Sequence, residues 1–366
     1  MQFTTPKEKI LNAVLIAERI VGKKESLPVL ACILLEVGKD LAVRSTNLEA
    51  GVDISVPGEV GEKGILAVPA SVLSQTLRAV SGDRVTLRAE GGNLLIEAQG
   101  SKTLIKAIPH DEFPGIVATK ETSRSLELSR TLLLQALQSV SYAASTSMIR
   151  PELGSVSISV KDGKLTTVAT DSFRLAEKTI SDASGDGGDD VLIPLKHVQE
   201  IIHLLEKITS EKISLSIDDS QLLITADSLR FVSRIVDGSF PNYKEIIPKQ
   251  FATEATILKG DFAEALRKAR VFSGADQHVG FHVYPKKKVF DVTAQSAAIG
   301  EMSDSLEAAI TGDDIDVNFH IGYIADCLQS IQSDSIVLSF AGPGKPVVIK
   351  GVSDATFMYL AMPLNR

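Results

Sequence analysis

One pattern occurs three times in this chain, as VPASVLSQTL at 68–77, IPLKHVQEII at 193–202 and FHIGYIADCL at 319–328. The starting positions 68, 193 and 319 are separated by 125 and 126 residues. A period of this length is that of a repeated domain, because solenoid units are only about 20–50 residues long. We therefore expect three copies of one small domain in a curved, modular body.

Each repeat is predicted to hold two helices and two strand pairs, which makes the fold class α+β with antiparallel sheets. An amphipathic helix comes first, starting at Pro6 in the first repeat and after the N-cap candidates Ser129 and Asp261 in the others. The quoted pattern supplies the second helix. Lys161-Asp162-Gly163-Lys164 is a strong hairpin-turn signal. The expected strand pairs are 33–37 with 41–45, 85–89 with 94–98, 156–160 with 165–169, 213–217 with 222–226, 280–284 with 289–293, and 336–340 with 347–350.

The repeats close on proline-containing segments at 112–114, 239–241 and 361–363. Polar segments that follow the first two mark the expected boundaries, so the predicted domains are 1–122, 123–249 and 250–366. The acidic, glycine-rich stretch 181–190 is interpreted as a solvated connection inside the second domain.

Composition bounds the class of protein. Of the 366 residues, 44% are hydrophobic and 23% charged, which is ordinary for a soluble globular chain. No apolar run reaches the length of about 18 residues that a membrane span needs, and the N-terminus lacks an apolar signal core. Cys32 and Cys327 stand in different repeats without metal-ligand spacing, so we expect two core thiols in the reducing cytoplasm.

The sequence offers little catalytic chemistry. His278 and His282 have a spacing that would suit a metal on a helix, but their segment is predicted to be a strand. The glycines of 342–346 fit a turn joining two strands better than a phosphate loop, and the acidic runs 186–190 and 313–316 lack EF-hand spacing. No GxSxG, P-loop or HExxH motif is present. These observations favour a binding protein with no catalytic residue, no metal and no cofactor.

Several motifs resemble one family in order and spacing. ATDSFRLA at 169–176 is similar to the Thr-Asp-x-x-Arg-Leu stretch of the bacterial sliding clamp family, the beta subunit of DNA polymerase III. FPNY at 240–243, YLAMPL at 359–364 and LPVL at 27–30 resemble further motifs of that family. Ser172-Phe173 departs from its common Gly-His pair, and the tail ends Leu364-Asn365-Arg366. Both departures fall in the partner groove that the resemblance implies.

The resemblance implies a homodimeric, non-catalytic processivity factor that slides on double-stranded DNA. Its partners would be a clamp loader, the replicative polymerase alpha subunit and other clamp-motif proteins. Their peptides would occupy a groove of aliphatic walls with an adaptable methionine and an arginine at its rim. Mapped residue by residue, the groove would be lined by Leu153, Thr170, Ser172, Phe173, Arg174, Leu175, Pro241, Ile246, His320, Tyr323, Pro346, Leu360, Met362, Pro363 and Leu364.

Geometry makes a separate case for a ring. A domain of about 120 residues has a radius of gyration near 14 Å, so it approximates a sphere roughly 35 Å across. Three such spheres leave a hole of only about 5 Å, whereas six leave one about 35 Å wide, enough for a duplex. Two chains in a two-fold dimer would supply six domains. We expect head-to-tail contacts between 102–108 of one chain and 267–272 of the other.

The net charge of −8 argues against DNA binding unless Lys and Arg gather on one face. We expect the helices to face the hole and the sheets to lie outside, with acidic residues mainly in loops. The cations on or after the helices include Lys7, Lys9, Arg19, Lys23, Arg130, Lys268 and Arg270. The DNA-facing residues are predicted to be Lys24, Arg78, Arg150, Lys196, Lys207 and Arg267, through weak phosphate contacts that allow sliding.

Alternatives remain open from the residues alone. The helix cations could be ordinary solvated faces, and the groove residues could simply fill a junction between domains. The chain could also be an enzyme with an active site between repeats, or a scaffold that does not encircle DNA. Converging carboxylates with perturbed pKa values would favour the enzyme, and lack of retention on circular DNA would favour the scaffold.

Overall fold

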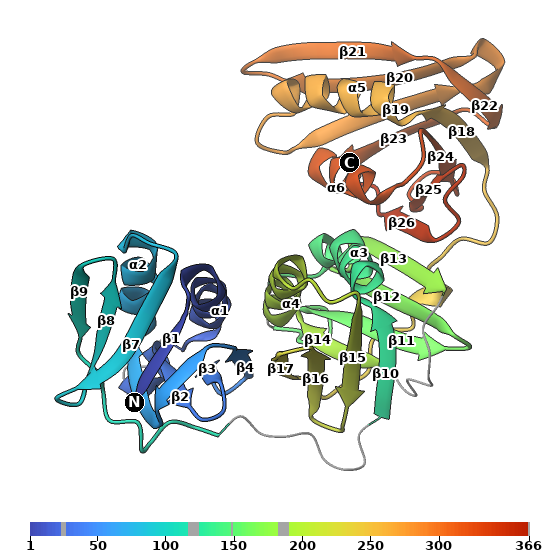
Figure 1. Ribbon diagram of the computed structural model, residues 1–366. Helices are drawn as coiled ribbons and strands as arrows, with labels where there is room; N and C mark the ends of the chain where they lie inside the picture. The colour runs from blue at the N-terminus through green and yellow to red at the C-terminus, as the bar shows by residue number, and fades with distance from the viewer. Residues whose placement is uncertain (23–26, 116–123, 148, 182–189, 365–366) are drawn as a thin grey trace. The chain divides into compact units, whose positions relative to one another are not determined.

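The computed structural model describes residues 1–22, 27–115, 124–147, 149–181 and 190–364. Its elements recur along the chain at the spacing of the sequence repeat (Figure 1). The first repeat holds β1 Gln2–Pro6, α1 Lys7–Ile20, η1 Pro28–Ala31, β2 Cys32–Val37, β3 Leu41–Thr46, β4 Ala50–Val56, β5 Glu59–Glu62, β6 Gly64–Pro69, α2 Ala70–Ala79, β7 Arg84–Glu90, β8 Asn93–Ala98 and β9 Ser101–Ile105.

The second and third repeats follow the same order. The second holds β10 Arg124–Ser129, α3 Arg130–Val140, η2 Ser141–Ala143, β11 Ser155–Lys161, β12 Lys164–Thr170, β13 Arg174–Ser181, β14 Val191–Pro194, α4 Leu195–Lys207, β15 Lys212–Ile217, β16 Gln221–Ala226, β17 Leu229–Arg234 and η3 Tyr243–Glu245. The third holds β18 Thr253–Leu258, α5 Lys259–Phe272, β19 His278–Tyr284, η4 Pro285–Lys287, β20 Val289–Ser296, β21 Gly300–Leu306, β22 Ala308–Gly312, β23 Ile315–His320, α6 Ile321–Cys327, η5 Leu328–Ser330, β24 Ser335–Phe340, β25 Val347–Gly351 and β26 Phe357–Ala361.

Contacts group the described chain into two compact units, and each takes part of the middle repeat. The first unit comprises 1–22, 27–115, 124–131 and 199–235, and the second comprises 132–147, 149–181, 190–198 and 236–364. The first contains a five-stranded sheet, β5-β1-β7-β8-β9, and an eight-stranded sheet, β10-β15-β16-β17-β4-β3-β2-β6. The second contains a nine-stranded sheet, β14-β11-β12-β13-β26-β25-β24-β18-β22, and a four-stranded sheet, β21-β20-β19-β23.

Two strand pairings join neighbouring repeats into continuous sheets. In the first unit β4 pairs antiparallel with β17, and in the second β13 pairs antiparallel with β26. In both cases the fourth strand of one repeat meets the last strand of the next repeat. This rule of pairing places loops that are distant in sequence side by side at the ends of the joined strands.

The helices cover the sheets with their apolar faces. Helix α1 buries Ile10, Val14 and Ile20, and it contacts α2, β3 and β4. In the third repeat Phe262 of α5 packs on Phe281 of the underlying sheet, with ring centroids 5.6 Å apart. Burial of such side chains is the main stabilising contribution, about 1.5–3 kcal/mol for each one fully buried.

Most of the predicted elements are confirmed. All six expected strand pairs form, and the turn after Lys161 has positive φ at Asp162 and Gly163, as a two-residue hairpin of type I′ requires. His278 and His282 lie in β19, and 342–346 join β24 to β25. Cys32 and Cys327 are buried free thiols, and burial raises the pKa of Cys32 to about 11.

The structure corrects some of the other predictions and leaves the rest untested. Asp261 is not an N-cap, because α5 already begins at Lys259 after Leu258, which leaves Asp261 in the first turn. Pro6 stands just before α1 rather than inside it. The structure also adds strands that the sequence patterns missed, including the fourth strand of each repeat, β4, β13 and β21. The acidic residues 182–189 lie outside the described part of the chain, and the domain boundaries remain a prediction.

The described residues hold neither a membrane-spanning helix nor a metal-binding cluster. None of their helices is long and apolar enough to cross a membrane. Within the same ranges, no group of three or more His, Cys, Asp or Glu side chains is placed to hold a metal ion.

Candidate functional site

The loop between β12 and β13 is fixed by its own side chains. The Thr170 hydroxyl donates to the carbonyl of Arg174 at 2.7 Å, and Asp171 accepts from the backbone N–H groups of Phe173 and Arg174 at 2.9 and 3.0 Å. Ser172 has a φ of 80°, in the left-handed region. The short polar residues of ATDSFRLA therefore build a tight turn that holds Phe173 outward, with 61% of its surface exposed.

Arg174 is the electrostatic centre of the site. Its guanidinium donates to Asp171 at 2.9 Å and to Asp326 of α6 at 2.7 Å, and it stacks over the Tyr323 ring at 4.5 Å. Burial alone would lower the pKa of Arg174, but Tyr359 and the two carboxylates raise it above its ordinary value. The side chain is therefore a permanent cation held in one place.

His320 and Tyr323 extend this polar side of the site. The backbone N–H of Tyr323 donates to Nδ1 of His320 at 3.4 Å, and the two rings are 4.3 Å apart. Burial lowers the pKa of His320, and the nearby Arg174 cation lowers it further. An imidazole that accepts at Nδ1 must be unprotonated there, so a neutral His320 caps α6.

The other face of the same strands is apolar. Leu175 pairs directly with Leu360, and both are almost fully buried in a cluster with Val168, Val348 and Met358. The partly buried Phe240, Tyr243, Ile247 and Met362 pack on that cluster. The Tyr243 hydroxyl donates to Glu177 at 2.5 Å, which fixes the FPNY segment over the strands. Burial raises the pKa of Tyr243, and the hydrogen bond to Glu177 raises it further.

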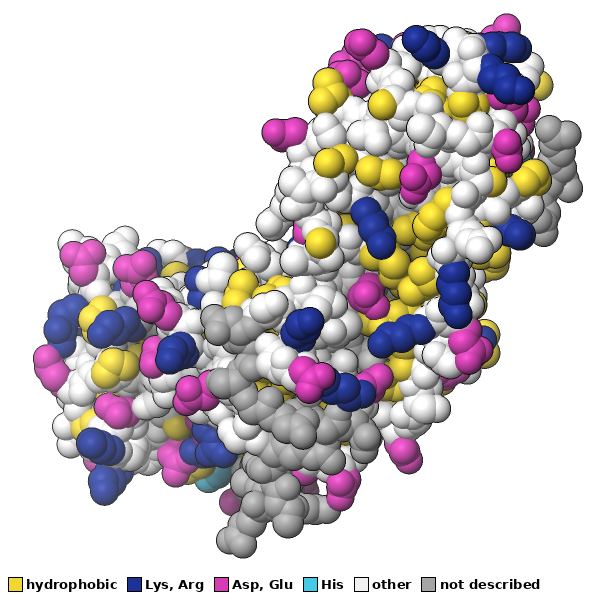
Figure 2. Space-filling view, turned by 90° about the vertical axis from the view of Figure 1, so that its right-hand side faces the viewer, with side chains coloured by type: hydrophobic (Ala, Val, Ile, Leu, Met, Phe, Trp, Pro, Cys, Tyr) yellow, Lys and Arg dark blue, Asp and Glu magenta, His cyan; other side chains and the backbone are white. Residues whose placement is uncertain are grey.

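The structure places the predicted groove residues on two sides of one sheet end. Adjacent strand residues point to opposite faces, so Arg174 lies on the side of α6 with His320 and Tyr323. Leu175, Leu360 and Met362 lie on the apolar side. Pro346 precedes Val347, the partner of Ala361, and so stands opposite Met362. The exposed Phe173 and Ile246 belong to the same unit. On the face of the protein shown in Figure 2, hydrophobic side chains (yellow) gather with Lys and Arg nearby.

The tail connects the two sides. Met362 donates its backbone N–H to the carbonyl of Phe173 at 2.8 Å, and Leu364 donates to Asn318 of β23 at 2.8 Å. Thr170, Pro363 and Leu364 thus border the site, while Ser172 is exposed at the turn. Leu153 is buried, and its backbone hydrogen bonds with Arg150 and Ser145 lie outside this cluster. Asn365 and Arg366 lie beyond the described residues.

Sequence reasoning missed the residues that support the site. Two of them, Asp171 and Asp326, accept hydrogen bonds from Arg174. The third is Tyr359, whose hydroxyl donates to the carbonyl of Tyr323 in α6 at 2.7 Å. Only Asp171 had a local signal, as an Asp at the start of a turn. Asp326 is 152 residues from Arg174, so no spacing along the chain could reveal it.

Comparison with known families decides the identity of this arrangement. Three family models match consecutive parts of the chain: the N-terminal domain of the DNA polymerase III beta subunit at 1–117, its central domain at 127–242 and its C-terminal domain at 244–365. The chain belongs to the DNA polymerase III beta subunit family.

Known members cover the whole chain at low identity. It is 26% identical to the beta sliding clamp of Bacillus subtilis and 24% identical to that of Vibrio cholerae, with all of both proteins aligned in each case. A crystal structure of the beta subunit from Thermotoga maritima superimposes with a TM-score of 0.94 at 26% identity, covering 100% of this chain and 99% of that one. The three-domain α+β clamp fold is therefore established.

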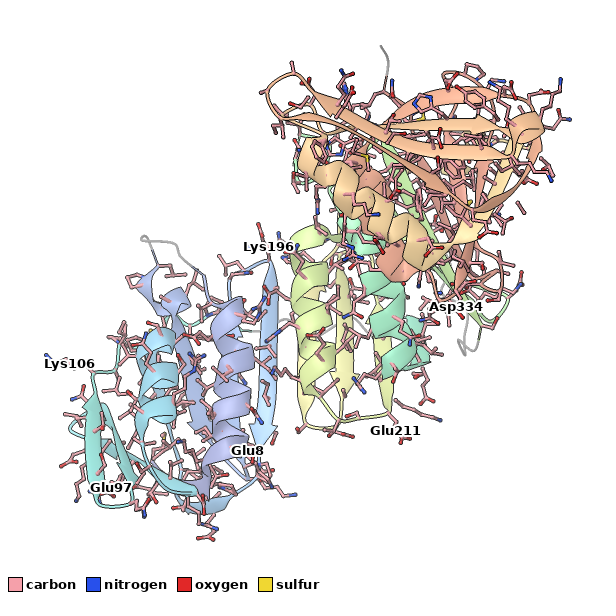
Figure 3. All side chains as sticks on the ribbon, turned by 90° about the horizontal axis from the view of Figure 1, so that it is seen from above. Glu8, Glu97, Lys106, Lys196, Glu211 and Asp334 are labelled. Atoms are coloured by element: carbon pink, nitrogen blue, oxygen red, sulfur yellow. The ribbon has the colours of Figure 1, made fainter. Side chains whose placement is uncertain are left out.

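The predicted DNA-facing cations of this beta subunit are exposed wherever they are described. Arg78 lies in the last turn of α2, Lys196 and Lys207 in α4, and Arg267 in α5, whereas Arg150 lies outside the helices and pairs with Glu152 at 2.9 Å. Lys24 falls outside the described residues. Figure 3 shows Lys196 at the start of α4 and Glu211 beyond its other end.

The charge pattern of the helices is less one-sided than predicted. Arg19 of α1 forms an ion pair with Glu200 of α4 at 2.6 Å, and Lys268 pairs with Glu264 and Asp304. These cations are partly neutralised inside the protein. Acidic residues therefore share the helices with Lys and Arg, so any attraction for phosphate is weaker than a count of cations suggests.

Proposed function

We propose that this chain is the processivity clamp of a bacterial replicative polymerase. Two copies would form a closed head-to-tail ring around duplex DNA, placed there by a clamp loader in the cytoplasm. The groove around Leu175 and Met362 would tether the polymerase alpha subunit and other clamp-motif proteins by short peptides. As a beta subunit, the chain is a non-catalytic part of the polymerase assembly.

The observation that carries the ring is the rule of strand pairing between repeats. The fourth strand of the first repeat, β4, pairs with the last strand of the second, β17, and β13 pairs with β26 in the same way. The third repeat has the corresponding strand β21 at the edge of its sheet, and the first repeat has β9 at an edge. Continuing the rule, β21 of one chain pairs with β9 of the next.

The properties of the two edges support this pairing. On β9, Leu104 is 54% exposed, and Figure 3 shows Glu97 and Lys106 at the two ends of this outer hairpin. Beside β21, Ile299 is 57% exposed and Val271, within the predicted contact segment 267–272, is 61% exposed. Unpaired strand edges with apolar side chains favour association, and pairing would cover both.

The number of repeats supports closure with two chains. Three domains around a closed triangle leave too small a hole for a duplex, whereas six leave one of about 35 Å. A cyclic dimer closes the heterologous β9–β21 contact twice. DNA would then be held by topology, so weak contacts from Arg78, Lys196, Lys207 and Arg267 suffice and allow sliding.

The test compares retention on closed and open DNA. Protein loaded onto a nicked circle should remain bound at salt concentrations that remove ordinary phosphate contacts, and a single cut through the circle should release it. Neutralising Lys24, Arg150 and Lys196 together should weaken direct binding to linear DNA and reduce its salt dependence by up to about one unit per lost contact. The triple variant should still be retained on circles. Equal loss from circular and linear DNA would contradict the ring.

A further inference from the structure

A second loop of the protein repeats the groove turn bond for bond. Between β3 and β4 the Thr46 hydroxyl donates to the carbonyl of Ala50 at 2.8 Å, as Thr170 does to Arg174 at 2.7 Å. Asn47 accepts from the N–H groups of Glu49 and Ala50 at 2.9 and 2.7 Å, as Asp171 in the next repeat accepts from those of Phe173 and Arg174. Leu48, with a φ of 76°, takes the place of Ser172, with a φ of 80°.

The neighbouring strands also coincide. Arg234 donates its backbone N–H to the carbonyl of Glu49 at 2.8 Å, the counterpart of the 2.8 Å bond from Met362 to Phe173. Ser233 pairs with Ala50 in the same register in which Ala361 pairs with Arg174. The closing segment repeats as well, since Phe113-Pro114 corresponds to Phe240-Pro241. The turn, the strand pairing and the Phe-Pro segment of the first groove thus have equivalents in the first unit.

A cavity of about 350 Å³ lies at this place, lined among others by Leu48, Gly51, Pro114, Gln221, Val232 and Arg234. Through the strand register these positions correspond to Ser172, Leu175, Pro241, Pro346, Leu360 and Met362. We propose that this cavity is a second peptide groove, which takes an extended segment of a partner protein carrying an aliphatic side chain next to a carboxylate. The proposal extends the peptide-tethering role proposed above to a second site with different specificity.

The substitutions between the two grooves define that occupant. Glycine at 51 in place of Leu175 leaves room above the buried Val232, so the floor accepts an aliphatic side chain. Arg234 in place of Met362 presents an exposed guanidinium, which pairs with a carboxylate. The two grooves would therefore select different peptides, because the first offers a sulfur-containing wall and the second a cation.

Gln221 supplies a second, independent observation. Its Oε1 is buried, and no donor among the described residues reaches it. A buried carbonyl oxygen without a partner is costly, and such groups in native proteins usually meet a ligand or water. Since Gln221 lines the cavity, a backbone N–H of an extended peptide is the donor that fits this position.

The experiment is a heteronuclear NMR titration of the full-length protein with acetyl-Gly-Asp-Leu-Gly-amide at millimolar concentration, and with the Asn analogue as control. We expect shifts at 46–51 and 221–234 that saturate with the Asp peptide. Arg234→Gln should weaken binding of the Asp peptide about fivefold and leave the Asn peptide unaffected. Gln221→Leu should weaken both peptides while the thermal midpoint stays equal or rises, because the variant removes an unpaired polar atom.

The controls separate this groove from the first one. Met362→Ala should leave the titration at 46–51 unchanged, because Met362 belongs to the other unit. Shifts confined to 170–175 and 359–364 would overturn the second groove while leaving the first intact. Saturation by N-acetylaspartate alone, or the absence of any shift at 46–51, would also overturn it. Failure of the ring in the retention experiment would not affect this readout, so the two proposals can fail separately.

Discussion

Ser172 stands where the backbone is left-handed, with a φ of 80°. A residue with a Cβ is strained there, and the resemblance to the clamp family implied a glycine at this place. Ser172→Gly should therefore stabilise the protein by about 1 kcal/mol, measured as a higher urea midpoint. Ser125→Gly, at an exposed position of strand β10, should destabilise it instead. Equal destabilisation by both changes would show that Ser172 carries no strain.

His320 makes stability depend on pH. Burial lowers its pKa, and so does Arg174, so the unfolded chain binds a proton more readily than the folded one. The contribution of His320 to the free energy of unfolding is fully present above the pKa of about 6.5 in the unfolded chain, and it is lost as the pH falls below that value. His320→Asn keeps a side chain that can cap α6, and it should flatten the urea midpoint between pH 7 and pH 5. His203, whose pKa is also lowered, is the matched control. His203→Gln should remove only the part of the pH dependence that His203 itself contributes.

At the scale of elements, sequence patterns predicted helices and hairpins, which depend on nearby residues, and missed strand pairings between residues distant in the chain. Apolar spacing located the helices, and the Asp162-Gly163 turn located a hairpin, because these depend on residues a few positions apart. The pairing of β13 with β26 leaves no such trace, since Leu175 and Leu360 meet only in the folded chain. Asp261 was misplaced as a cap because the apolar stripe starts at Phe262, whereas the helix already starts at Lys259, which bonds to Asp334 and Ile331.

The same limit applies to the candidate groove. Its list of residues came from a family resemblance, and the structure adds that the residues lie on two faces of one sheet end. Residue identity alone could not indicate this division, because it follows from the alternation of side chains along β13 and β26. The ion pair of Arg174 with Asp326 is likewise a product of tertiary packing.

Met362 is the best probe of the groove, because it is only partly buried. Met362→Ala should weaken a partner peptide by about 1–3 kcal/mol, measured by calorimetry, with little change in unfolding. Leu175→Ala is less informative, since Leu175 is fully buried and its loss should cost about 2–5 kcal/mol of stability. Val352→Ala, exposed outside the groove cluster, is the control and should leave affinity unchanged. Unaltered affinity in Met362→Ala would place the peptide elsewhere.

At the scale of the whole molecule, the strand rule predicts a register as well as a partner. Ser233 stands opposite Ala50, and Ala361 stands opposite Arg174 in the equivalent pair. The hairpin registers show that Ile105 of β9 corresponds to Ser233, and Gly300 of β21 to Ala50. Ile105 of one chain should therefore stand opposite Gly300 of the other. Two residues further along, Thr103 of one chain should stand opposite Met302 of the other. Both side chains are half-buried in the single chain.

Cysteines at these two positions test the ring directly. A Thr103→Cys, Met302→Cys double variant should oxidise to a covalent dimer closed at both contacts, because opposed strand positions bring their Cβ atoms to about 4.5–5.5 Å. The native thiols, Cys32 and Cys327, are buried and should not compete. Oxidised after loading onto a nicked circle, the double variant should stay with the DNA even in denaturant, and cutting the circle should free it. Thr103→Cys with Asp304→Cys, two residues out of register, should cross-link poorly. Efficient cross-linking of that pair, or dissociation of the oxidised protein from intact circles, would contradict the predicted closure.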